Sequence, residues 1–221
     1  MTYSTILSIP KRKNGYVAIK TDMAKAYDRL EWKFIKATML SMGFPIHIVS
    51  IIMKCVTSVS YSILINGRPS TRFKPQRGIR QGDPLSPYLF ILYANVFSAL
   101  ISKAQLDNQI HGVKIAPGAL EISHLSFADD SLILCKANKS EASTIHLIIS
   151  TYQEASGQLV NLDKSELLFS KYVNQQAKTE VMSCLPMQVV TVFSKYLGMP
   201  TYIGRSKNRF LTTYKKGFGK N

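Results

Sequence analysis

The chain has 221 residues, of which 46% are hydrophobic, and it carries 28 lysines and arginines against 13 aspartates and glutamates. This much apolar sequence can bury a core, which excludes general disorder, and the length suits one large domain. The net charge of +15 fits a polyanionic partner, most simply nucleic acid. Cys55, Cys135 and Cys184 are few and far apart without metal-ligand spacing, which favours a reducing compartment.

The first part of the chain alternates predicted strands and helices. Tyr16 to Asp22 is an apolar run typical of a buried strand, and Trp32 to Leu40 has helical spacing. Pro45 begins a second predicted helix. Tyr61 to Pro69 predicts a strand that ends in an Asn-Gly turn, with the return strand expected near Thr71 to Phe73.

A polar loop rich in glycine and arginine, residues 76–83, precedes the most apolar stretch, Leu85 to Ile101. The stretch lies at the short end of the roughly 17–25 residues that a membrane span requires. Ser86, Asn95 and Ser98 also interrupt it. The sequence therefore favours a buried core helix over a membrane span, and we expect no membrane partner.

Two apolar strands joined by a tight turn at Ala128 to Asp130 follow, and the second strand ends at Cys135. Ser140 is expected to cap a helix that runs to about Ser156 and ends at Gly157. Downstream, the pattern predicts a strand, a short helix and a further strand, at Glu166 to Phe169, Gln175 to Leu185 and Tyr196 to Gly198. This mixture predicts an α+β domain with an antiparallel sheet packed on helices.

Asp129 and Asp130 are adjacent between the two apolar strands. Two like charges at such a hairpin tip are costly unless a cation neutralises them, and a divalent metal is the usual answer because it prefers carboxylate oxygens. Asp22 ends the first predicted strand, and three carboxylates on two strands are what a two-metal phosphoryl-transfer site requires. Because adjacent strand residues point to opposite faces, one of Asp129 and Asp130 should bind metal more directly than the other.

These residues also have structural interpretations. Asp22 lies where a strand meets a helix and could be an N-cap, and an Asp-Asp turn could be a solvated hairpin tip. We expect Asp28 to be structural, either pairing with Arg29 or capping the helix that holds Trp32. The Gly- and Arg-rich segment 75–87 could bring its backbone close to a ligand and direct arginines onto phosphates. It lacks the ending of a P-loop, however, and could equally be a basic surface loop.

In combination, the motifs resemble those of one family. Asp22-x4-Tyr27, then Arg-Gln-Gly-Asp-Pro-Leu-Ser-Pro from Arg80, then Phe-Ala-Asp-Asp ending at Asp130, occur in the order typical of reverse transcriptases. The chain resembles those of non-LTR (LINE-type) retrotransposons, in particular those of plant genomes. Two further segments resemble the fourth and fifth motifs of that family, at Ser156 to Ser165 and Tyr196 to Pro200.

The resemblance implies a role for each motif residue. Asp22 and Asp129 would hold two Mg²⁺ ions, with Asp130 supporting them and Mn²⁺ as the alternative ion. Tyr27 would be the steric gate, an aromatic ring that crowds a ribose 2′-hydroxyl. Gln81 and Gly82 would line the nucleotide pocket, and Arg80 would contact a phosphate or the template. Phe127 and Ala128 would lie at the primer terminus. Lys164 would assist the leaving pyrophosphate.

The implied function is RNA-directed DNA polymerisation, in which dNTPs are added to a DNA primer on an RNA template. The resemblance covers about residues 12–210 and implies a single domain over 1–221: a polymerase palm core at about 14–200 with partial fingers, the thumb mostly absent, and a basic tail at 201–221. We expect the fingers, thumb and endonuclease regions of the family in a longer parent, and little or no activity from this chain alone. The alternatives are a related palm polymerase or intron maturase, and an inactive retroelement remnant that at most binds nucleic acid.

Overall fold

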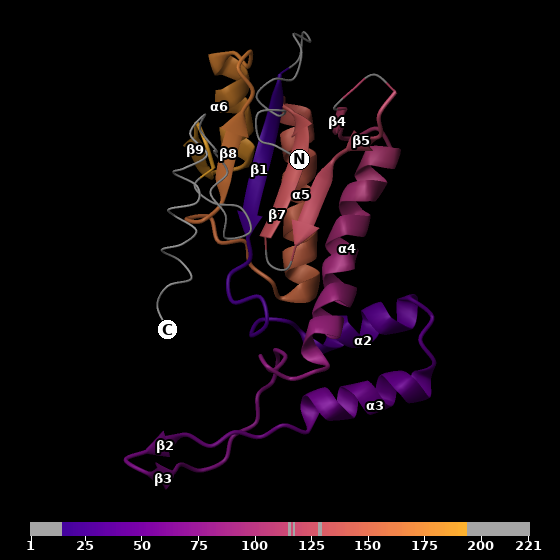
Figure 1. The fold of residues 1–221 in the computed structure, drawn as a ribbon, viewed down its shortest axis with the longest axis vertical. Coiled ribbons are helices and arrows are strands. Elements are labelled where there is room, and N and C mark those ends of the chain that lie inside the picture. The colour runs from indigo at the N-terminus through magenta and orange to yellow at the C-terminus, as the bar shows by residue number, and fades with distance from the viewer. Residues whose placement is uncertain (1–14, 115, 117, 128–129, 194–221) are drawn as a thin grey trace, which may run out of the picture.

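A five-stranded sheet in the order β6–β7–β1–β8–β9 forms the centre of the computed structural model (Figure 1). The structure describes residues 15–114, 116, 118–127 and 130–193. The strands of this sheet are β1 (Tyr16–Asp22), β6 (His124–Phe127), β7 (Asp130–Lys136), β8 (Glu166–Phe169) and β9 (Gln188–Val190). Ala128, Asp129, the strand expected at 196–198 and the basic tail lie outside the described residues.

The central strand β1 pairs antiparallel with β7 on one side and with β8 on the other. β6 and β7 form the antiparallel hairpin that the sequence predicts. β8 and β9 pair in parallel, so the sheet is antiparallel except at this edge. Strand β9, which has only three residues, was not predicted.

Five helices are described, and those nearest the sheet cover one of its faces. Their bounds are α2 (Trp32–Ser41), α3 (Ile46–Thr57), α4 (Ser86–Leu106), α5 (Lys139–Ser156) and α6 (Gln175–Cys184). α5 packs against β7 and α4 against β6, α2 packs on both of these helices, and α3 packs on α2. The predicted α+β class is confirmed.

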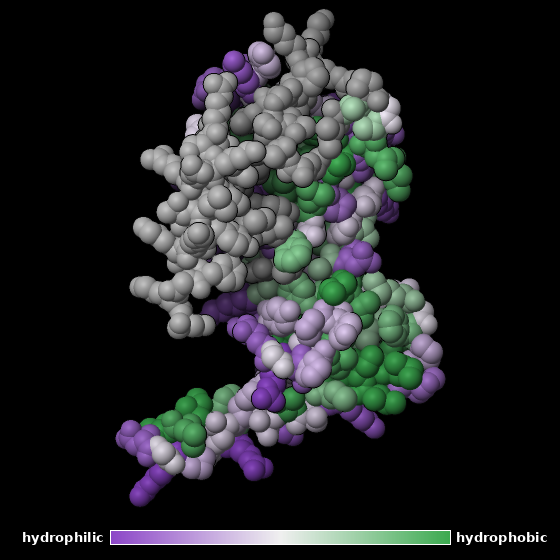
Figure 2. All heavy atoms as spheres, in the orientation of Figure 1, coloured by the Kyte–Doolittle hydropathy of each residue, from purple (hydrophilic) through white to green (hydrophobic). Residues whose placement is uncertain are grey.

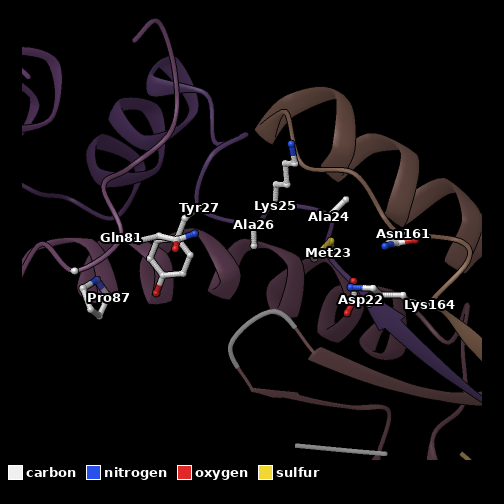
Figure 3. A pocket seen from close by; sticks show the side chains of 11 residues that line it. Asp22, Met23, Ala24, Lys25, Ala26, Tyr27, Gln81, Pro87, Asn161 and Lys164 are labelled. Carbon is white, nitrogen blue, oxygen red and sulfur yellow. The ribbon is translucent and has the colours of Figure 1, made fainter. Parts of the chain in front are cut away.

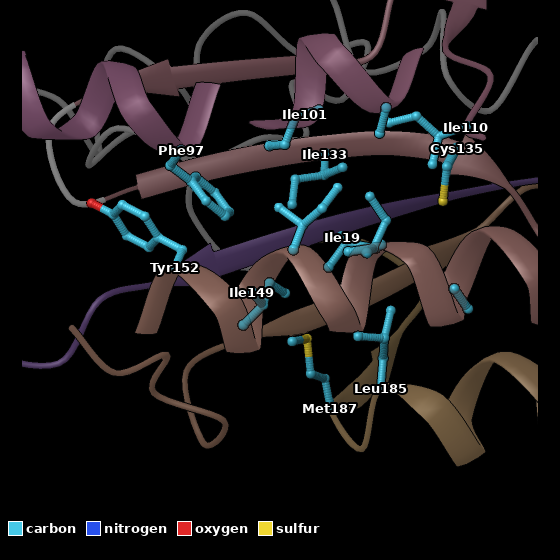
Figure 4. Close-up of a cluster of buried hydrophobic side chains, with 14 of the residues drawn as sticks. Ile19, Phe97, Ile101, Ile110, Ile133, Cys135, Ile149, Tyr152, Leu185 and Met187 are labelled. Atoms are coloured by element: carbon cyan, nitrogen blue, oxygen red, sulfur yellow. The ribbon is translucent and has the colours of Figure 1, made fainter. Parts of the chain in front are cut away.

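The main hydrophobic core lies between the sheet and these helices (Figure 4). Ile19 of β1 and Ile133 of β7 are opposite each other in register and fully buried. They pack in one cluster with Phe97 and Ile101 of α4 and Ile149 of α5. Burial of side chains of this size contributes about 1.5–3 kcal/mol each, which holds α4 and α5 on the sheet.

Helix α4 belongs to this core, as the sequence predicts. By length and composition it is apolar enough to cross a membrane. Its buried residues include Leu89, Tyr93 and Phe97, which join the main cluster, while Tyr88 and Ile91 on the other side are exposed. The helix therefore contributes one face to the core of this domain.

The opposite face of the sheet carries a second, smaller cluster. Strand side chains alternate between the faces, so Tyr16 and Ala18 of β1 pack with Leu132 and Leu134 of β7 on the side away from α4 and α5. Asp22 continues this row at the end of β1. The carboxylate thus emerges on the face of the sheet that these helices leave open.

Two predicted boundaries were wrong. The return strand of the first hairpin begins at Arg68, directly after the Asn66-Gly67 turn, and not near Thr71. A two-residue turn of this type leads straight into the return strand. The strands are β2 (Leu64–Ile65) and β3 (Arg68–Pro69), and an isolated bridge joins Tyr61 to Phe73.

Helix α5 also starts earlier than predicted. The side chain of Asn138, and not of Ser140, caps it by accepting a hydrogen bond from the backbone N–H of Glu141 at 2.8 Å. Gly157 ends the helix in the left-handed conformation, as predicted. A short pair of strands, β4 (Val113–Lys114) and β5 (Glu121–Ile122), was not predicted.

The hairpin β2–β3 extends away from the sheet (Figure 1), and apolar side chains gather on it and around α2 and α3 (Figure 2). Ile63, Leu64 and Ile65 of the hairpin are more than half exposed, as are Ile46 and Ile51 of α3. Exposed apolar side chains that gather in this way are typical of contact surfaces. The main core ends before it reaches the hairpin.

The segment before α2 packs closely on the end of α5, and two glycines that follow helices allow this packing to be tested by substitution. Both Gly157 and Gly43 have positive φ, of 76° and 82°. A Cβ at Gly157 would lie 2.7 Å from the carbonyl oxygen of Arg29, whereas one at Gly43 would meet open space. We predict that Gly43→Ala lowers the unfolding free energy by about 1 kcal/mol through left-handed strain alone. Gly157→Ala should lower the unfolding free energy by about 1–3 kcal/mol more than Gly43→Ala, because the backbone at Arg29 must move to admit the Cβ.

Urea unfolding of the two variants and the unsubstituted chain measures these free energies. Equal losses in the two variants would contradict the close packing of Arg29 on the end of α5.

Candidate active site

Asp22 and Asp130 lie directly opposite each other, at the end of β1 and the start of β7. Directly opposite side chains on an antiparallel pair share a face, with Cβ atoms about 4.5–5.5 Å apart. Asp22 is not a helix N-cap, because α2 begins only at Trp32. Asp129 lies outside the described residues. The expectation that one of Asp129 and Asp130 binds metal more directly than the other therefore stays a prediction.

The backbone around Asp22 is held by the segment that follows α5. The backbone N–H of Asn161 donates to the Asp22 carbonyl at 2.8 Å, and the Asp22 N–H donates to the Ser165 hydroxyl at 3.3 Å. That hydroxyl in turn donates to the Asn161 carbonyl at 2.7 Å. These bonds bring Lys164, whose N–H also donates to the Asn161 carbonyl, next to the end of β1.

A cavity of about 760 Å³ opens beside Asp22. Asp22, Asn161 and Lys164 lie at one end of it, and Tyr27, Gln81 and Pro87 lie at the other (Figure 3). The cavity therefore has charged groups at one end and an aromatic ring at the other. Its full lining is Asp22, Met23, Ala24, Lys25, Ala26, Tyr27, Gln81, Gly82, Pro87, Asn161 and Lys164.

Tyr27 is held by its ring and by its backbone. The ring stacks on Phe90 of α4, with centroids 4.8 Å apart and an interplanar angle of 15°. The backbone N–H of Ile79 donates to the Tyr27 carbonyl at 2.8 Å. The same strand-like contact continues at Gly78, whose N–H donates to the Leu30 carbonyl at 2.8 Å. The Gly- and Arg-rich segment is thereby fixed against the segment after β1.

The end of the Gly- and Arg-rich segment leads directly into α4. The Asp83 carboxylate accepts a hydrogen bond from the Leu85 N–H at 2.9 Å, and the Asp83 carbonyl accepts one from the Ser86 N–H at 3.1 Å. Pro87 in the first turn suits a helix start because it has no N–H to leave unbonded. This turn holds Gln81 and Gly82 in the lining of the cavity.

The hairpin that carries the aspartates is fastened to α4 through His124 of β6. Its Nε2 lies 2.5 Å from the Ser98 hydroxyl, and its Nδ1 lies 3.1 Å from the Ser123 hydroxyl. Burial lowers the pKa of His124, which keeps the ring neutral near pH 7. The hairpin therefore has a fixed side-chain link to the helix that also positions Tyr27.

The structure unites some of the predicted site residues and separates others. Asp22, Tyr27, Gln81, Gly82 and Lys164 line one cavity, although they come from three distant parts of the sequence.

Arg80 and Phe127 are not among the described residues that line that cavity. Arg80 lines a second cavity of about 460 Å³, which also includes Gln81. Phe127 is 63% exposed and pairs with Asp130 across the hairpin.

Comparison with known proteins decides the family. The family model of reverse transcriptase (RNA-dependent DNA polymerase) matches residues 4–201, which is most of the chain. The chain belongs to the reverse transcriptase family. The resemblance seen in the motifs is confirmed, and the description of the family names a nucleic-acid template. Reverse transcriptases as a family also use divalent metal ions.

Similar curated proteins include products of retrotransposable elements. The chain is 48% identical over 68 residues to an uncharacterized mitochondrial protein of Arabidopsis thaliana, covering 31% of this chain and 56% of that protein. It is 32% identical over 119 residues to a Pol polyprotein from the type-1 retrotransposable element R2 of Popillia japonica, covering 54% of this chain and 19% of the polyprotein. It is 33% identical over 124 residues to the Pol polyprotein of the Drosophila melanogaster element R2DM, covering 56% of this chain and 11% of the polyprotein. The chain thus spans little more than half of the first protein and less than a fifth of the polyproteins.

Similar solved structures include yeast telomerases. A telomerase of Candida tropicalis matches with a TM-score of 0.56 and 19% identity, covering 78% of this chain and 34% of that one. The Candida albicans telomerase in complex with a fragment of telomeric RNA matches with a TM-score of 0.54, also at 19% identity, covering 76% and 28%. At this identity the likeness shows a shared fold.

The cavity of this reverse transcriptase chain has lining residues that motif reading missed. Met23 to Ala26 line it in the stretch directly after Asp22, where the sequence changes from strand to turns. Lys25 has a positive φ of 51°, which is uncommon for a residue with a side chain. Asn161 could have been found, because it lies within the fourth motif and three residues before Lys164.

Asp28 has neither of the roles expected from the sequence. Glu31 occupies the N-cap position of α2, and its side chain makes no capping hydrogen bond. The Arg29 Nε donates to the Gly157 carbonyl at 3.2 Å, and within the described part of the chain no ion pair joins Asp28 to Arg29. A Cβ at Gly78 would lie 2.7 Å from the Asp28 carbonyl oxygen, so this backbone forms part of a tight contact.

The donors at the ends of β1 and β7 have the chemistry of a divalent-metal site. Asp22 and Asp130 supply carboxylate oxygens, which Mg²⁺ prefers. Among residues 15–114, 116, 118–127 and 130–193, no group of three or more His, Cys, Asp or Glu side chains could hold a metal ion. A third carboxylate would have to come from Asp129, which lies outside these ranges.

The opposed carboxylates give a prediction for the isolated chain. Like charges directly opposite on neighbouring strands are destabilising, by about 0.2–1 kcal/mol. In EDTA, Asp130→Asn should therefore raise the melting temperature. Millimolar Mg²⁺ should stabilise the unsubstituted chain more than the variant, because a ligand that binds only the folded state raises its stability.

Circular dichroism melts with and without Mg²⁺ check both effects. Asp107→Asn is the matched control for the Mg²⁺ response, because Asp107 is exposed at the far end of α4; Mg²⁺ should stabilise this variant as much as the unsubstituted chain. A destabilised Asp130→Asn variant in EDTA, with an unchanged response to Mg²⁺, would contradict the carboxylate pair.

Proposed function

We propose that this chain is the palm segment of an RNA-directed DNA polymerase of a non-LTR retrotransposon. The reaction is addition of a deoxynucleotide to the 3′ end of a DNA primer on an RNA template. One observation carries the proposal: Asp22, Tyr27, Gln81 and Lys164, each singled out from a separate motif, line the same cavity. A cavity with a carboxylate and an amine at one end and an aromatic ring at the other suits a nucleoside triphosphate.

The residues that would hold the metal ions are Asp22 and Asp129, with Asp130 supporting them. Their support is the register that sets Asp22 opposite Asp130, and carboxylate oxygens fit a hard divalent cation. When bound, two Mg²⁺ ions, or Mn²⁺ in their place, supply charge that lowers the pKa of the primer 3′-hydroxyl and balances the leaving pyrophosphate.

Lys164 would bind the phosphates of the incoming nucleotide and assist the leaving pyrophosphate. It lines the same end of the cavity as Asp22, and the backbone bonds of Asn161 and Ser165 fix the turn that carries it. A lysine ammonium is a compact charge with three donors, which suits phosphate oxygens. Catalysis in such a site is mostly positioning and charge balance.

Tyr27 would contact the sugar and exclude a 2′-hydroxyl. Its ring stacks on Phe90, so it presents a supported face with little freedom to move aside. Gln81 lies at the same end of the cavity as Tyr27, and Gln81 and Gly82 would line the pocket beside it. Gly82 has a positive φ of 83° and open space where a Cβ would be, which lets a ligand approach the backbone.

Arg80 would contact the template. It lines the second cavity together with Arg77, Tyr61 and Gln81, and Gln81 also lines the first cavity. Arginines beside an aromatic ring suit a single-stranded nucleic acid, through phosphate contacts and base stacking. The template strand would thus pass from one cavity to the other across Gln81, while Phe127 and Ala128 would lie on the primer side of the aspartate hairpin.

RNA as the template agrees with the charge of the chain and with its relatives. The net charge of +15 favours a polyanionic partner that binds in a salt-dependent manner. The similar polyproteins come from retrotransposable elements, and one similar telomerase was solved with an RNA fragment. The parent polypeptide is the whole product of the open reading frame that encodes this chain. These likenesses support RNA as its template, DNA as its primer and dNTPs as its substrates.

The test is primer extension on an RNA template by the parent polypeptide. Asp129→Asn should reduce incorporation at least about a hundredfold, because the developing charge at the reacting phosphate loses its stabilisation. The melting temperature of the Asp129→Asn variant should be the same as that of the unsubstituted protein.

Asp107→Asn, which changes an exposed aspartate far from the cavity, is the control and should extend primers normally. Unchanged extension by Asp129→Asn would remove Asp129 from the metal site. Absence of any synthesis by the unsubstituted parent would remove the proposed function.

A further inference from the structure

The carbonyl of Ala26, directly before Tyr27, accepts two side-chain hydrogen bonds from different parts of the fold. The Tyr93 hydroxyl of α4 donates to it at 3.2 Å, and the Gln158 amide Nε2 donates to it at 2.7 Å. All three residues are buried, and Gln158 is only 1% exposed. The peptide that leads into Tyr27 is therefore held from two directions in a setting that excludes water.

The ring of Tyr27 is held by the same helix. Phe90 stacks on it, and Phe90 also packs edge-on against Tyr93, with centroids 4.8 Å apart. Residues three apart on a helix lie on one face, so α4 fixes the Tyr27 ring through Phe90 and the preceding peptide through Tyr93. Gln158 supplies the second anchor of that peptide from the segment after α5.

The buried side chain of Gln158 lowers the stability of the fold compared with an apolar side chain of the same size. Within the described part of the chain its Oε1 is buried and has no hydrogen-bond partner. A buried polar group without a partner costs free energy, and an apolar side chain of the same size would avoid that cost. The bond from its Nε2 to the Ala26 carbonyl is the contact that an apolar residue could not make.

We propose that Gln158 and Tyr93 are positioning residues that set the sugar selectivity of the site. They fix the peptide between Ala26 and Tyr27, and thereby the place of the Tyr27 ring. This inference rests on the proposed contact of Tyr27 with the nucleotide sugar. A gate that excludes one hydroxyl group depends on the position of its ring to within about an ångström, because errors of that size alter reaction rates strongly.

The experiment compares ribonucleotide with deoxynucleotide incorporation by the parent polypeptide opposite the same template base. The measured quantity is kcat/KM for the ribonucleotide divided by kcat/KM for the deoxynucleotide. General loss of stability lowers both values together and leaves the ratio unchanged. Displacement of the Tyr27 ring raises the ratio.

Tyr93→Phe and its matched control each remove one buried hydroxyl and keep the ring. The control is Tyr152→Phe, because the Tyr152 hydroxyl donates to the Tyr93 carbonyl at 3.5 Å and does not reach Ala26. We expect the ratio to rise several-fold in Tyr93→Phe and about tenfold or more in Gln158→Leu, in the range typical of a pocket that changes by one small group. Tyr152→Phe should leave it unchanged.

The outcomes separate this inference from the proposed function. An unchanged ratio in both Tyr93→Phe and Gln158→Leu, or an equal rise in Tyr152→Phe, would overturn the positioning role. Tyr27→Val is the reference: if it also leaves the ratio unchanged, Tyr27 does not contact the sugar and that part of the proposed function fails. No incorporation by the unsubstituted parent would overturn the proposed function and, with it, this inference.

Discussion

The register of β1 against β7 is the constraint on which the site depends. It sets Asp22 opposite Asp130, and it is fixed by the core on both faces of the sheet. Ile19 and Ile133 pack toward the helices, while Ala18 and Leu134 pack on the other face. A slip of one residue would exchange these faces and expose the apolar rows. The hydrophobic core thus enforces a pair of like charges that would otherwise be avoided.

Backbone contacts build the rest of the cavity around this pair. The last residue of β1 accepts a bond from Asn161, and the segment after β1 accepts bonds from Gly78 and Ile79. Glycine is required where the chains come closest, because a Cβ at Gly78 or Gly157 would lie 2.7 Å from a carbonyl oxygen. Three distant parts of the sequence meet here because their main chains, more than their side chains, fit together.

The sequence predicts the long elements well, because each has a clear apolar pattern. The run Tyr16–Asp22 reads as a buried strand, and α4 reads as a core helix. Strands of two or three residues, such as β9 (Gln188–Val190), carry too little pattern to be seen. Motif residues could be predicted by resemblance, but Met23 to Ala26 line the cavity in a stretch between strand and helix, where no side-chain pattern marks them. The role of Gln158 depends on a contact with Ala26, 132 positions away in the sequence.

Paramagnetic broadening by Mn²⁺ tests the central claim most directly, because it reports where a divalent ion binds in the isolated chain. If the ends of β1 and β7 form one metal site, substoichiometric Mn²⁺ broadens the NMR signals of Asp22, Asp130 and their neighbours first. Asp22→Asn then abolishes this local effect. Broadening centred elsewhere in the chain, or unchanged in the Asp22→Asn variant, would contradict a metal site at these strand ends.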